Sequence, residues 1–452
     1  MMREAPFQPL PAPTPTPLVG RRVLVLGLGD TGLSLARWIE REGGKVRLAD
    51  SRRDPPRKAD YAGELHTGPF SARLLDEVDA VCVSPGLSLE EEIIRQALMK
   101  GLPVLGDIEL FAWHARQPVV AITGTNGKST VTALAGHLLR SAGVDCEVAG
   151  NIGPPVLQAF EKRLSAGKLP RAWVLELSSY QLETTWSLAP AAAAMLNLTE
   201  DHFDRYASLE HYGAAKARIF MGAGVQVLNR DDARSLAMAQ AGKSVLTFGL
   251  DAPRKPQDFG VVANRLVQGG GEILRVDELA IRGAHNVANA LAACALACAL
   301  GIAPAALAPG LRTFGGLPHR LQLVATRRGV EWYDDSKGTN VGATVAALRG
   351  LGRKSVLILG GDGKGQDFSA LKDPVARYAS KVLLIGRDAP LIARVVAGER
   401  CASLEEAVQK AAELATPGEA VLLSPACASF DMFRDYRHRG EVFAQAVKGL
   451  GA

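Results

Sequence analysis

The sequence predicts an α/β fold divided into three domains with mainly parallel sheets. Its 452 residues are enough for about three domains, each with its own core. Short β-branched or Leu-rich runs alternate with helical patterns along the chain, which is typical of parallel sheets covered by helices. Ligands collect beyond the carboxyl ends of such strands, so the informative residues should directly follow the apolar runs.

The composition limits the function classes that the chain can serve. Hydrophobic residues make up 47% of the chain and charged residues 22%, as in an ordinary globular protein. The net charge of +5, without a dense Lys/Arg block, argues against nucleic acid as a partner but suits anionic small molecules. Six scattered cysteines without a CxxC pair indicate reduced thiols, so we expect a cytoplasmic protein.

Two segments could be mistaken for targeting or membrane segments. Residues 1–19 are rich in proline and lack the apolar core of a secretory signal, so we expect a disordered tail. The uncharged, Ala-rich stretch from Ala288 is interrupted by Gly301 and Pro304 after about thirteen residues. That length suits a buried helix, and we expect no membrane insertion.

The first domain, expected over residues 20–106, carries a dinucleotide-type fingerprint. We expect strands at residues 22–27, 46–50, 80–86 and 103–107. The first strand leads into Gly27-Leu28-Gly29-Asp30-Thr31-Gly32 and a helical pattern, and the second strand ends in Asp50, eighteen residues after Gly32. This spacing satisfies the fingerprint of nicotinamide-dependent dehydrogenases.

The second domain, expected over residues 107–316, carries a different nucleotide signal. Strands are expected at residues 118–124, 172–179 and 192–199. The first of them leads into the sequence TGTNGKST, residues 123–130, and then a helix. Backbone N–H groups and the helix dipole would face a phosphate there, the lysine would neutralise it, and a hydroxyl could reach Mg²⁺. Ile122 stands where the P-loop pattern has its first glycine.

Polar residues follow the other strands of this domain. Glu176 lies in an apolar run, where a carboxylate is costly unless it is paired or binds a metal. A structural role for Glu176 and a metal-binding role are equally supported by the pattern. His202 follows the third strand with Glu200, Asp201 and Asp204 nearby, which favours phosphate or Mg²⁺ chemistry. For Lys216 and Arg218, the local periodicity favours a solvated basic helix face.

The third domain, expected over residues 317–452, repeats the α/β pattern with strands at residues 331–336, 355–363, 381–387 and 420–426. The chain thus holds two nucleotide signals with different chemistry. A dehydrogenase needs the first signal and has no use for the second. A phosphoryl-transfer enzyme needs the second, and its first domain could bind another diphosphate.

Motifs along nearly the whole chain from about residue 19 closely resemble the Mur ligase family. They are GDIELF, GTNGKST, GNIG, LELSSYQLE, LNLTEDHFDRY, AAKARIF, GAHNVANALAA, GLPHR, DDSKGTN, GGDGKGQDF and SPACASFDMF, in the order of the family. The resemblance is closest to its D-glutamate-adding branch. It implies an N-terminal Rossmann-like UDP-binding domain, a central P-loop ATPase-like domain and a C-terminal Rossmann-like amino-acid-binding domain.

By this resemblance, the first domain holds UDP instead of a nicotinamide cofactor. The implied reaction joins D-glutamate to the L-alanyl carboxylate of UDP-N-acetylmuramoyl-L-alanine, with ATP converted to ADP and phosphate through an acyl phosphate. It would belong to peptidoglycan precursor synthesis, and we expect a monomer. The residues implied for the UDP substrate are Asp30, Thr31, Asp50, Arg52, Ser84, Pro85, Gly86 and Asn151.

The resemblance also implies an ATP site between the second and third domains. Its residues would be Gly124, Thr125, Asn126, Gly127, Lys128, Ser129, Thr130, Asn289, Arg320 and Asp335. Two Mg²⁺ ions would be held by Ser129, Glu176, His202 and Lys216. Lys216 matches the lysine that the family carbamylates with CO₂, which turns an ammonium into a metal ligand. The implied catalytic residues are Lys128, His202 and Lys216.

D-Glutamate would bind at the strand ends of the third domain. The implied residues are Lys337, Thr339, Lys364, Ser429 and Tyr436; Gly338 replaces the alanine that is usual in this motif. Three alternatives stay open. They are an NAD(P)-dependent dehydrogenase, a non-catalytic nucleotide-binding regulator of the same fold, and a Mur ligase that adds a different amino acid.

Overall fold

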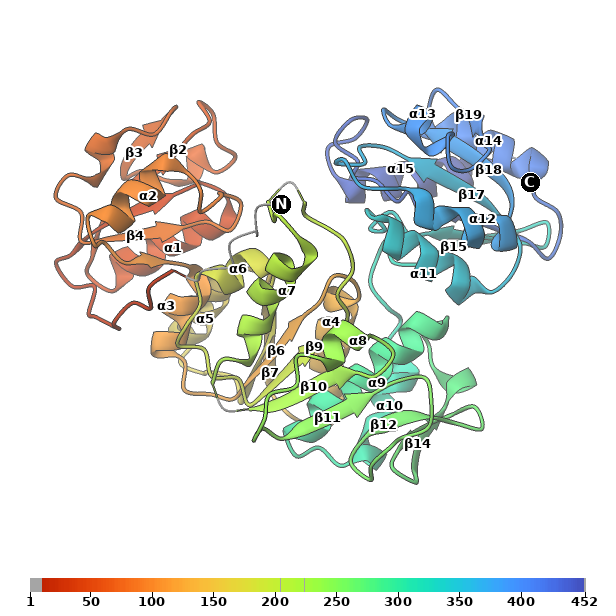
Figure 1. Cartoon of the computed structure of the whole chain (residues 1–452), viewed down its shortest axis with the longest axis horizontal. Coiled ribbons are helices and arrows are strands. Elements are labelled where there is room, and N and C mark those ends of the chain that lie inside the picture. Colours follow the sequence, from red (N-terminus) through yellow and green to blue (C-terminus); the bar gives the residue numbers. More distant parts are fainter. Residues whose placement is uncertain (1–9, 204, 223, 451–452) are drawn as a thin grey trace, which may run out of the picture.

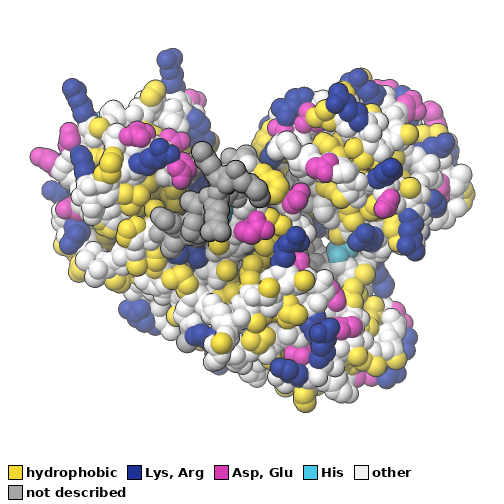
Figure 2. All heavy atoms as spheres, viewed as in Figure 1, with side chains coloured by type: hydrophobic (Ala, Val, Ile, Leu, Met, Phe, Trp, Pro, Cys, Tyr) yellow, Lys and Arg dark blue, Asp and Glu magenta, His cyan; other side chains and the backbone are white. Residues whose placement is uncertain are grey.

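The computed structural model describes residues 10–203, 205–222 and 224–450. They form three α/β domains that appear as three lobes in Figure 1, with the first (orange) and third (blue) on opposite sides above the second. In the space-filling view, a notch separates the first and third domains at the top of the molecule (Figure 2). The predicted fold class is confirmed.

The first domain is a five-stranded parallel sheet in the order β3-β2-β1-β4-β5. Its strands are β1 (Arg22–Leu26), β2 (Lys45–Asp50), β3 (Glu64–Thr67), β4 (Ala80–Val83) and β5 (Val104–Leu105). Its helices are α1 (Asp30–Arg41), α2 (Glu92–Met99) and the short 3₁₀ turns at Lys58–Asp60 and Ala72–Leu75. Because β1 is buried between β2 and β4, its four apolar residues point into both layers and the polar turn follows at its carboxyl end.

The second domain is built on a nine-stranded sheet in the order β14-β13-β12-β11-β10-β9-β6-β8-β7. Its strands are β6 (Val119–Thr123), β7 (Cys146–Gly150), β8 (Ala172–Glu176), β9 (Ala192–Met195), β10 (Val225–Asn229), β11 (Val245–Phe248), β12 (Phe259–Val262), β13 (Arg265–Gln268) and β14 (Gly271–Arg275). All pairs are parallel except those that β13 makes with β12 and β14. Of these nine strands, the sequence predicted only β6, β8 and β9.

Helices cover both faces of this second sheet. They are α3 (Asp107–His114), α4 (Lys128–Ser141), α5 (Val156–Ser165), α6 (Ser179–Glu183), α7 (Leu209–Ala217), α8 (Ala233–Leu236), α9 (Ala284–Ala299) and α10 (Ala308–Thr313), with 3₁₀ turns at Arg218–Phe220, Val276–Glu278 and Pro304–Leu307. The Ala-rich segment forms α9, which is largely buried and ends before Gly301, as the sequence predicts. Within the described ranges, none of the helices combines the length and apolarity that a bilayer crossing requires.

The third domain is a six-stranded sheet in the order β15-β16-β20-β17-β18-β19, parallel except for the β15–β16 pair. Its strands are β15 (Gln322–Arg327), β16 (Val330–Asp334), β17 (Ser355–Gly360), β18 (Ala379–Ile385), β19 (Glu399–Arg400) and β20 (Ala420–Leu423). Its helices are α11 (Val341–Leu351), α12 (Lys372–Tyr378), α13 (Ala389–Ile392), α14 (Leu404–Leu414) and α15 (Tyr436–Gly449), with a 3₁₀ turn at Ser369–Leu371.

The domains are joined in two different ways. One apolar core runs through the first and second domains, and Trp38 of α1 packs on Phe160 of α5 with ring centroids 5.3 Å apart. The third domain has two cores of its own, on the two faces of its sheet. It meets the second domain partly through polar side chains, such as Arg320 on Ser129. The first two domains therefore form one packed body, against which the third is docked.

The expectation of a disordered tail over residues 1–19 is wrong for part of that segment. Residues 1–9 lie outside the described residues. Leu18 is buried in the core shared by the first two domains. The carbonyl of Leu10 accepts a hydrogen bond of 3.2 Å from the indole N–H of Trp186. Apolar side chains spaced between the prolines thus anchor residues 10–19 to the folded body.

Candidate active site

A cavity of about 960 Å³ lies where the three domains meet. Its walls come from the turns after β1, β2, β4 and β7, from the start of α4 and from Gln181 of α6. The third domain contributes residues 317–320, 337, 436, 437 and 441. The eight residues predicted for the UDP substrate all line it: Asp30, Thr31, Asp50, Arg52, Ser84, Pro85, Gly86 and Asn151. The residues predicted for the UDP substrate, which follow the strand ends, therefore surround one cavity.

Asp50 is fully engaged inside the first domain. It is 2% exposed, and its Oδ2 accepts from the backbone N–H of Leu28 at 2.7 Å and from Arg52 at 2.7 Å. Its Oδ1 accepts from the backbone and side-chain N–H groups of Arg52, both at 2.9 Å. Burial alone would raise the pKa of Asp50, but the hydrogen bonds from Arg52 and Leu28 outweigh it and lower the pKa. Four donors thus occupy the lone pairs of this carboxylate.

The glycine turn after β1 is tied to the turn after β4. The hydroxyl of Ser84 donates to the carbonyl of Gly27 at 3.0 Å. A Cβ at Gly32 would lie 1.7 Å from that same carbonyl oxygen, so only glycine lets α1 approach the turn. The resulting compact turn at the start of α1 has the geometry of an anion-binding site.

The phosphate turn, residues 124–130, runs from the end of β6 into the first residues of α4 in the second domain. Gly124 and Gly127 have φ values of +152° and +85°, which L side chains rarely adopt. The ammonium of Lys128 is half-buried and donates to the carbonyls of Gly124 at 2.9 Å and Thr125 at 2.8 Å. Burial lowers the pKa of Lys128, and Glu176 and Asp201 act in the opposite direction. The lysine therefore folds over its own turn, and among the described residues it forms no ion pair with a carboxylate.

Glu176 ends β8 beside this turn and meets the requirement for a metal ligand. The side chain is 2% exposed, and its Oε1 accepts from the amide of Asn151 at 2.6 Å. Its Oε2 is buried and has no hydrogen-bond partner among the described residues. Because an unpaired buried carboxylate oxygen is costly, a cation at Oε2 would relieve that cost. The hydroxyl of Ser129 and this oxygen are the donor types that Mg²⁺ prefers.

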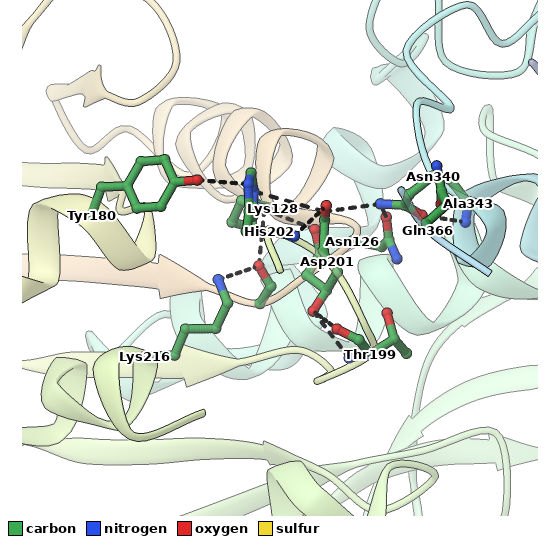
Figure 3. A network of polar contacts seen from close by, with 12 residues as sticks. Asn126, Lys128, Tyr180, Thr199, Asp201, His202, Lys216, Asn340, Ala343 and Gln366 are labelled. Carbon is green, nitrogen blue, oxygen red and sulfur yellow. Dashed lines mark hydrogen bonds and ion pairs between the residues drawn. The ribbon is translucent and has the colours of Figure 1, made fainter. Parts of the chain in front are cut away.

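His202 follows β9 on a strained loop. Its φ is +57°, and its Nδ1 lies 2.7 Å from the hydroxyl of Tyr180. Burial is the main cause that lowers its pKa; Asp201 acts in the opposite direction, and the charges of Lys128 and Lys216 lower it further. The imidazole is therefore neutral at neutral pH and can offer a ring nitrogen to a cation. Figure 3 shows His202 between Tyr180 and the phosphate turn.

The expectation that Lys216 lies on a solvated helix face is wrong. Its side chain is 1% exposed because it extends from α7 into the protein interior, as far as Thr123 and Gly124 at the carboxyl end of β6. The ammonium donates to the carbonyl of Gly124 at 2.8 Å and lies 4.5 Å from the centroid of the Tyr212 ring. Burial, reinforced by the charge of Lys128, lowers the pKa of Lys216 well below its usual value. Arg218 is half-buried and donates to backbone carbonyls.

The predicted metal-binding residues surround the phosphate turn but do not form a cage. Within the described part of the chain, no three His, Cys, Asp or Glu side chains are grouped so that they could hold a metal. Mg²⁺ does not need such a cage, because it usually keeps waters and binds one or two carboxylates together with substrate phosphates. The residues present therefore fit Mg²⁺ brought with a nucleotide.

A second cavity of about 280 Å³ lies between the second and third domains. Six residues predicted for ATP line it: Asn126, Gly127, Thr130, Asn289, Arg320 and Asp335. Ser129 lines the large cavity instead, whereas Gly124, Thr125 and Lys128 line neither of the two. Residues that the sequence did not predict also line this second cavity, among them Phe248, Leu250 and His285. Phe248 could not be found because it belongs to β11, a strand that the sequence did not predict.

Arg320 and Lys337 lie on the boundary between the two cavities. Both residues line both of them, and Arg320 donates to the hydroxyl of Ser129 at 2.8 Å. Burial and the charge of Arg320 lower the pKa of Lys337 to about 8. Burial raises the pKa of Asp335, at the end of β16, to about 7. Positive charge from the third domain is thus placed next to the phosphate turn.

The residues predicted for D-glutamate separate into two groups. Lys337 and Tyr436 line the large cavity, with the ammonium 3.8 Å from the centroid of the Tyr436 ring. Thr339, Lys364 and Ser429 line neither of the two cavities. Lys364 is exposed, and its charge is a minor cause that lowers the pKa of His202. Ser429 is buried on the loop after β20.

Models of known families match most of the chain. They are described as the Mur ligase MurD-like N-terminal domain (residues 21–106), the Mur ligase middle domain (residues 122–297) and the Mur ligase glutamate ligase domain (residues 319–427). The chain belongs to the Mur ligase family. The family predicted from the sequence motifs is thereby confirmed.

Relatives within the Mur ligase family match over nearly their full length. The chain is 55% identical to the UDP-N-acetylmuramoylalanine–D-glutamate ligase of Thiobacillus denitrificans, covering 96% of this chain and 98% of the relative. It is 52% identical to the protein of the same name from Nitrosospira multiformis, covering 96% and 97%. Among solved structures, the UDP-N-acetylmuramate–alanine ligase of Thermotoga maritima is similar with a TM-score of 0.60 at 19% identity, covering 94% and 99%. That last likeness is one of fold.

Proposed function

We propose that the protein is an ATP-dependent ligase that joins D-glutamate to the L-alanyl carboxylate of UDP-N-acetylmuramoyl-L-alanine, in peptidoglycan precursor synthesis. One observation carries the proposal. The cavity that is lined by the residues predicted for the UDP substrate extends to Ser129, Arg320 and Lys337, beside the phosphate turn. A carboxylate held in this cavity would therefore lie next to a phosphate bound at that turn. The names of the relatives at 55% and 52% identity support the same reaction.

The proposal assigns one ligand to each domain. Residues 20–106 would hold the uridine diphosphate, residues 107–316 the ATP phosphates, and residues 317–452 D-glutamate. Both nucleotide substrates are cytoplasmic metabolites, so we place the reaction in the cytoplasm. We expect a monomer, because the two cavities are lined by residues of all three domains of a single chain.

The chemistry must overcome the low reactivity of a carboxylate. An oxygen of the L-alanyl carboxylate attacks the γ-phosphorus of ATP, and ADP leaves. The amine of D-glutamate then attacks the carbonyl carbon, the bond to the phosphate oxygen breaks, and phosphate leaves with the amine proton lost to a base. Two anions must first approach each other, so fixed positive charge at that point lowers the barrier. Arg320 and Lys337, which line the large cavity, and Lys128 of the phosphate turn would supply that charge.

Magnesium would be held at the same place. Ser129, Glu176 and His202 fit two Mg²⁺ ions that enter with ATP, and the unpartnered Oε2 of Glu176 supports this role. When bound, the ions neutralise charge on the phosphates and the carboxylate. The residues named above would hold the ions, and the docked domains would limit the access of water to the acyl phosphate, which is easily hydrolysed.

A carbamate on Lys216 would complete the metal site. An ammonium cannot bind Mg²⁺, but burial lowers the pKa of this lysine, so a larger fraction is the neutral amine that attacks CO₂. The nitrogen–carbon bond forms, a proton is released, and the product carries a carboxylate-like group. The hydrogen bond that the Lys216 ammonium donates to the carbonyl of Gly124 supports a position of this group beside the phosphate turn.

D-Glutamate would be held between the third domain and the phosphate turn. Lys337 and Tyr436 already face the large cavity. Thr339, Lys364 and Ser429 would reach the side-chain carboxylate from the loops that follow β16, β17 and β20. Cations and hydroxyl donors suit a second carboxylate at this point.

The dehydrogenase alternative is disfavoured by the geometry of Asp50. In dinucleotide-binding domains the corresponding acid accepts from ribose hydroxyls. Here Arg52 and Leu28 already fill its acceptor positions. The phosphate turn and the cations around it would also have no function in hydride transfer. A regulator without activity would not need Lys128, Glu176, His202 and Lys216 together.

The test is phosphate release from ATP with UDP-N-acetylmuramoyl-L-alanine as the acceptor. D-Glutamate, L-glutamate, L-alanine and diaminopimelate are compared as the second substrate, with NAD(P)H oxidation followed in parallel. We expect turnover with D-glutamate alone. Equal turnover with another amino acid would assign a different Mur ligase reaction, and NAD(P)H oxidation without ATP turnover would assign a dehydrogenase.

A further inference from the structure

Asn340 connects the third domain to the phosphate turn of the second. It precedes α11, and its Oδ1 accepts from the backbone N–H of Ala343 at 2.8 Å, which is a typical N-cap. Its Nδ2 donates to Asn126 Oδ1 at 3.3 Å and to Asp201 Oδ2 at 3.2 Å. One side chain thus caps a helix of its own domain and holds two residues of the neighbouring domain.

The surroundings show that this contact is closely fitted. Asn340 is 7% exposed, so its amide has left water. A Cβ on Gly342 would lie 3.3 Å from Asn126 Nδ2 and 3.5 Å from Thr199 Oγ1, because the first turn of α11 comes close to both loops. The N–H of Val341 donates to Gln366 Oε1 at 3.0 Å. Figure 3 shows Asn340 pointing from the third domain toward Asn126 and Asp201.

Asp201 links Asn340 to the loop that carries His202. Its Oδ1 accepts from the backbone N–H of His202 at 2.9 Å, so Asn340 and His202 are held by two oxygens of one carboxylate. His202 in turn contacts the hydroxyl of Tyr180. Since His202 has a φ of +57°, its loop depends on such contacts to keep its conformation.

The other end of this loop is fixed to the first domain. Arg205 donates to the carbonyls of Pro85 at 3.2 Å and Leu87 at 2.8 Å, in the turn that lines the large cavity. It also pairs with Glu183 at 2.6 Å, and its guanidinium lies 4.1 Å from the centroid of the Tyr180 ring. Arg205 therefore holds the loop that carries His202 to the first domain, and Asn340 contacts the same loop from the third domain.

We propose that Asn340 is a positioning residue that couples docking of the third domain to the placement of Asp201 and His202. When the third domain is docked, its amide orients Asp201 and thereby the backbone of His202. When the domain moves away, these hydrogen bonds break and the loop keeps only its contacts to the first and second domains. The proposal deepens the ligase function proposed above and rests on it for its kinetic readout.

Two substitutions separate this role from helix capping. Ser and Asp cap helices about as well as Asn, so Asn340→Ser and Asn340→Asp should both keep α11. Serine is too short to reach the second domain, and aspartate would place a carboxylate against Asp201. Ser403 caps α14 in the same domain, and Ser403→Asn serves as the matched control.

We expect kcat for D-glutamate-dependent phosphate release to fall about 10-fold in Asn340→Ser, which loses two hydrogen bonds, and about 100-fold in Asn340→Asp, which adds a buried like-charge contact. The Kd of UDP-N-acetylmuramoyl-L-alanine, measured by calorimetry, should change less than about twofold, because the walls of its cavity are mostly provided by other domains. Ser403→Asn should match the wild type, and the melting temperatures of all variants should agree.

Small-angle scattering gives a second readout that needs no turnover. With AMP-PNP, Mg²⁺ and the UDP substrate, the wild type and Ser403→Asn should reach the same compact state, and Asn340→Asp should remain more extended. Wild-type kcat in both Asn340 variants, or a loss of kcat that follows a loss of melting temperature, would overturn the proposal. If the wild type lacks D-glutamate-dependent turnover, the proposed function fails, and scattering still decides the coupling.

Discussion

Lys216 has the most unusual environment among the charged side chains at the candidate site. It is buried against the phosphate turn, and its ammonium donates to the hydroxyl of Thr123 and the carbonyl of Gly124, both neutral oxygens. Lys128 lies near enough to lower its pKa further. A lysine kept as an ammonium in such a place would be destabilising. Conversion to a carbamate would remove the buried cation and provide a ligand for the metal.

We predict that Lys216→Ala loses at least about 100-fold in kcat and that acetate partly restores it, because a small carboxylate can take the place of the carbamate. Activity is measured with 0 to 200 mM acetate, about the range needed for a weak ligand of this size. Lys128→Ala is the matched control. It removes a cation from the same turn, so acetate should not restore it. Full activity of Lys216→Ala would contradict the carbamate.

Single residues also mark the limit of sequence reasoning. The local pattern predicted a solvated face for Lys216, because the burial of α7 depends on contacts with β6, which is distant in sequence. Only the family motif indicated its role. Glu176 could be recognised from the apolar run around it, but its unpartnered oxygen follows from the turn that brings Asn151 to it.

At the scale of elements, the site is a set of turns between buried strands and helices. The sequence located β1, β6, β8 and β9 correctly, because they are continuous apolar runs in the middle of parallel sheets. It missed β3, β7, β10 to β15 and β19, each of which contains partly exposed residues and most of which lie at or near sheet edges. Their patterns are weak because only part of each strand is buried.

The helix α4 allows a direct test of the phosphate turn, because a glycine with positive φ lies near each of its ends. Gly127 has a φ of +85° and Gly143 one of +80°. A Cβ at Gly127 would lie 2.6 Å from Asn289 Oδ1, whereas one at Gly143 meets nothing within 4 Å. Both positions demand a conformation that costs an alanine about 1 kcal/mol.

We predict that Gly127→Ala and Gly143→Ala each lower the free energy of unfolding by about 1 kcal/mol, and that Gly127→Ala loses somewhat more because of the contact with Asn289. Only Gly127→Ala should raise the KM for ATP, by about 10-fold or more, since it displaces the turn that faces the phosphates. Urea unfolding and initial rates measure the two effects. Equal KM values for ATP in the two variants would show that the turn does not bind the nucleotide.

At the scale of the whole molecule, the most important feature is that the first and second domains contact each other in a different way from the second and third. The first two domains share an apolar core, so their relative placement should be fixed. The third domain keeps its own cores and reaches the phosphate turn through Arg320 and Asn340. A site divided in this way can admit substrates when open and exclude water when docked.

The domain arrangement is also what the sequence could not supply. Motif order predicted three α/β domains and the residues that line the large cavity, because most of those residues lie at strand ends of the first sheet. It could not predict that Lys337 and Tyr436 face this cavity while Thr339 and Ser429 do not line it. That difference depends on the angle at which the third domain docks, which no local pattern encodes.

The central claim is that the cations around the phosphate turn let ATP activate a carboxylate. The most direct measurement uses UDP-N-acetylmuramoyl-L-alanine carrying ¹⁸O in its alanyl carboxylate, with the released phosphate analysed by mass spectrometry. If the carboxylate attacks the γ-phosphorus, one labelled oxygen must leave with the phosphate in each turnover. Phosphate that carries no label while the amide bond forms would contradict the account.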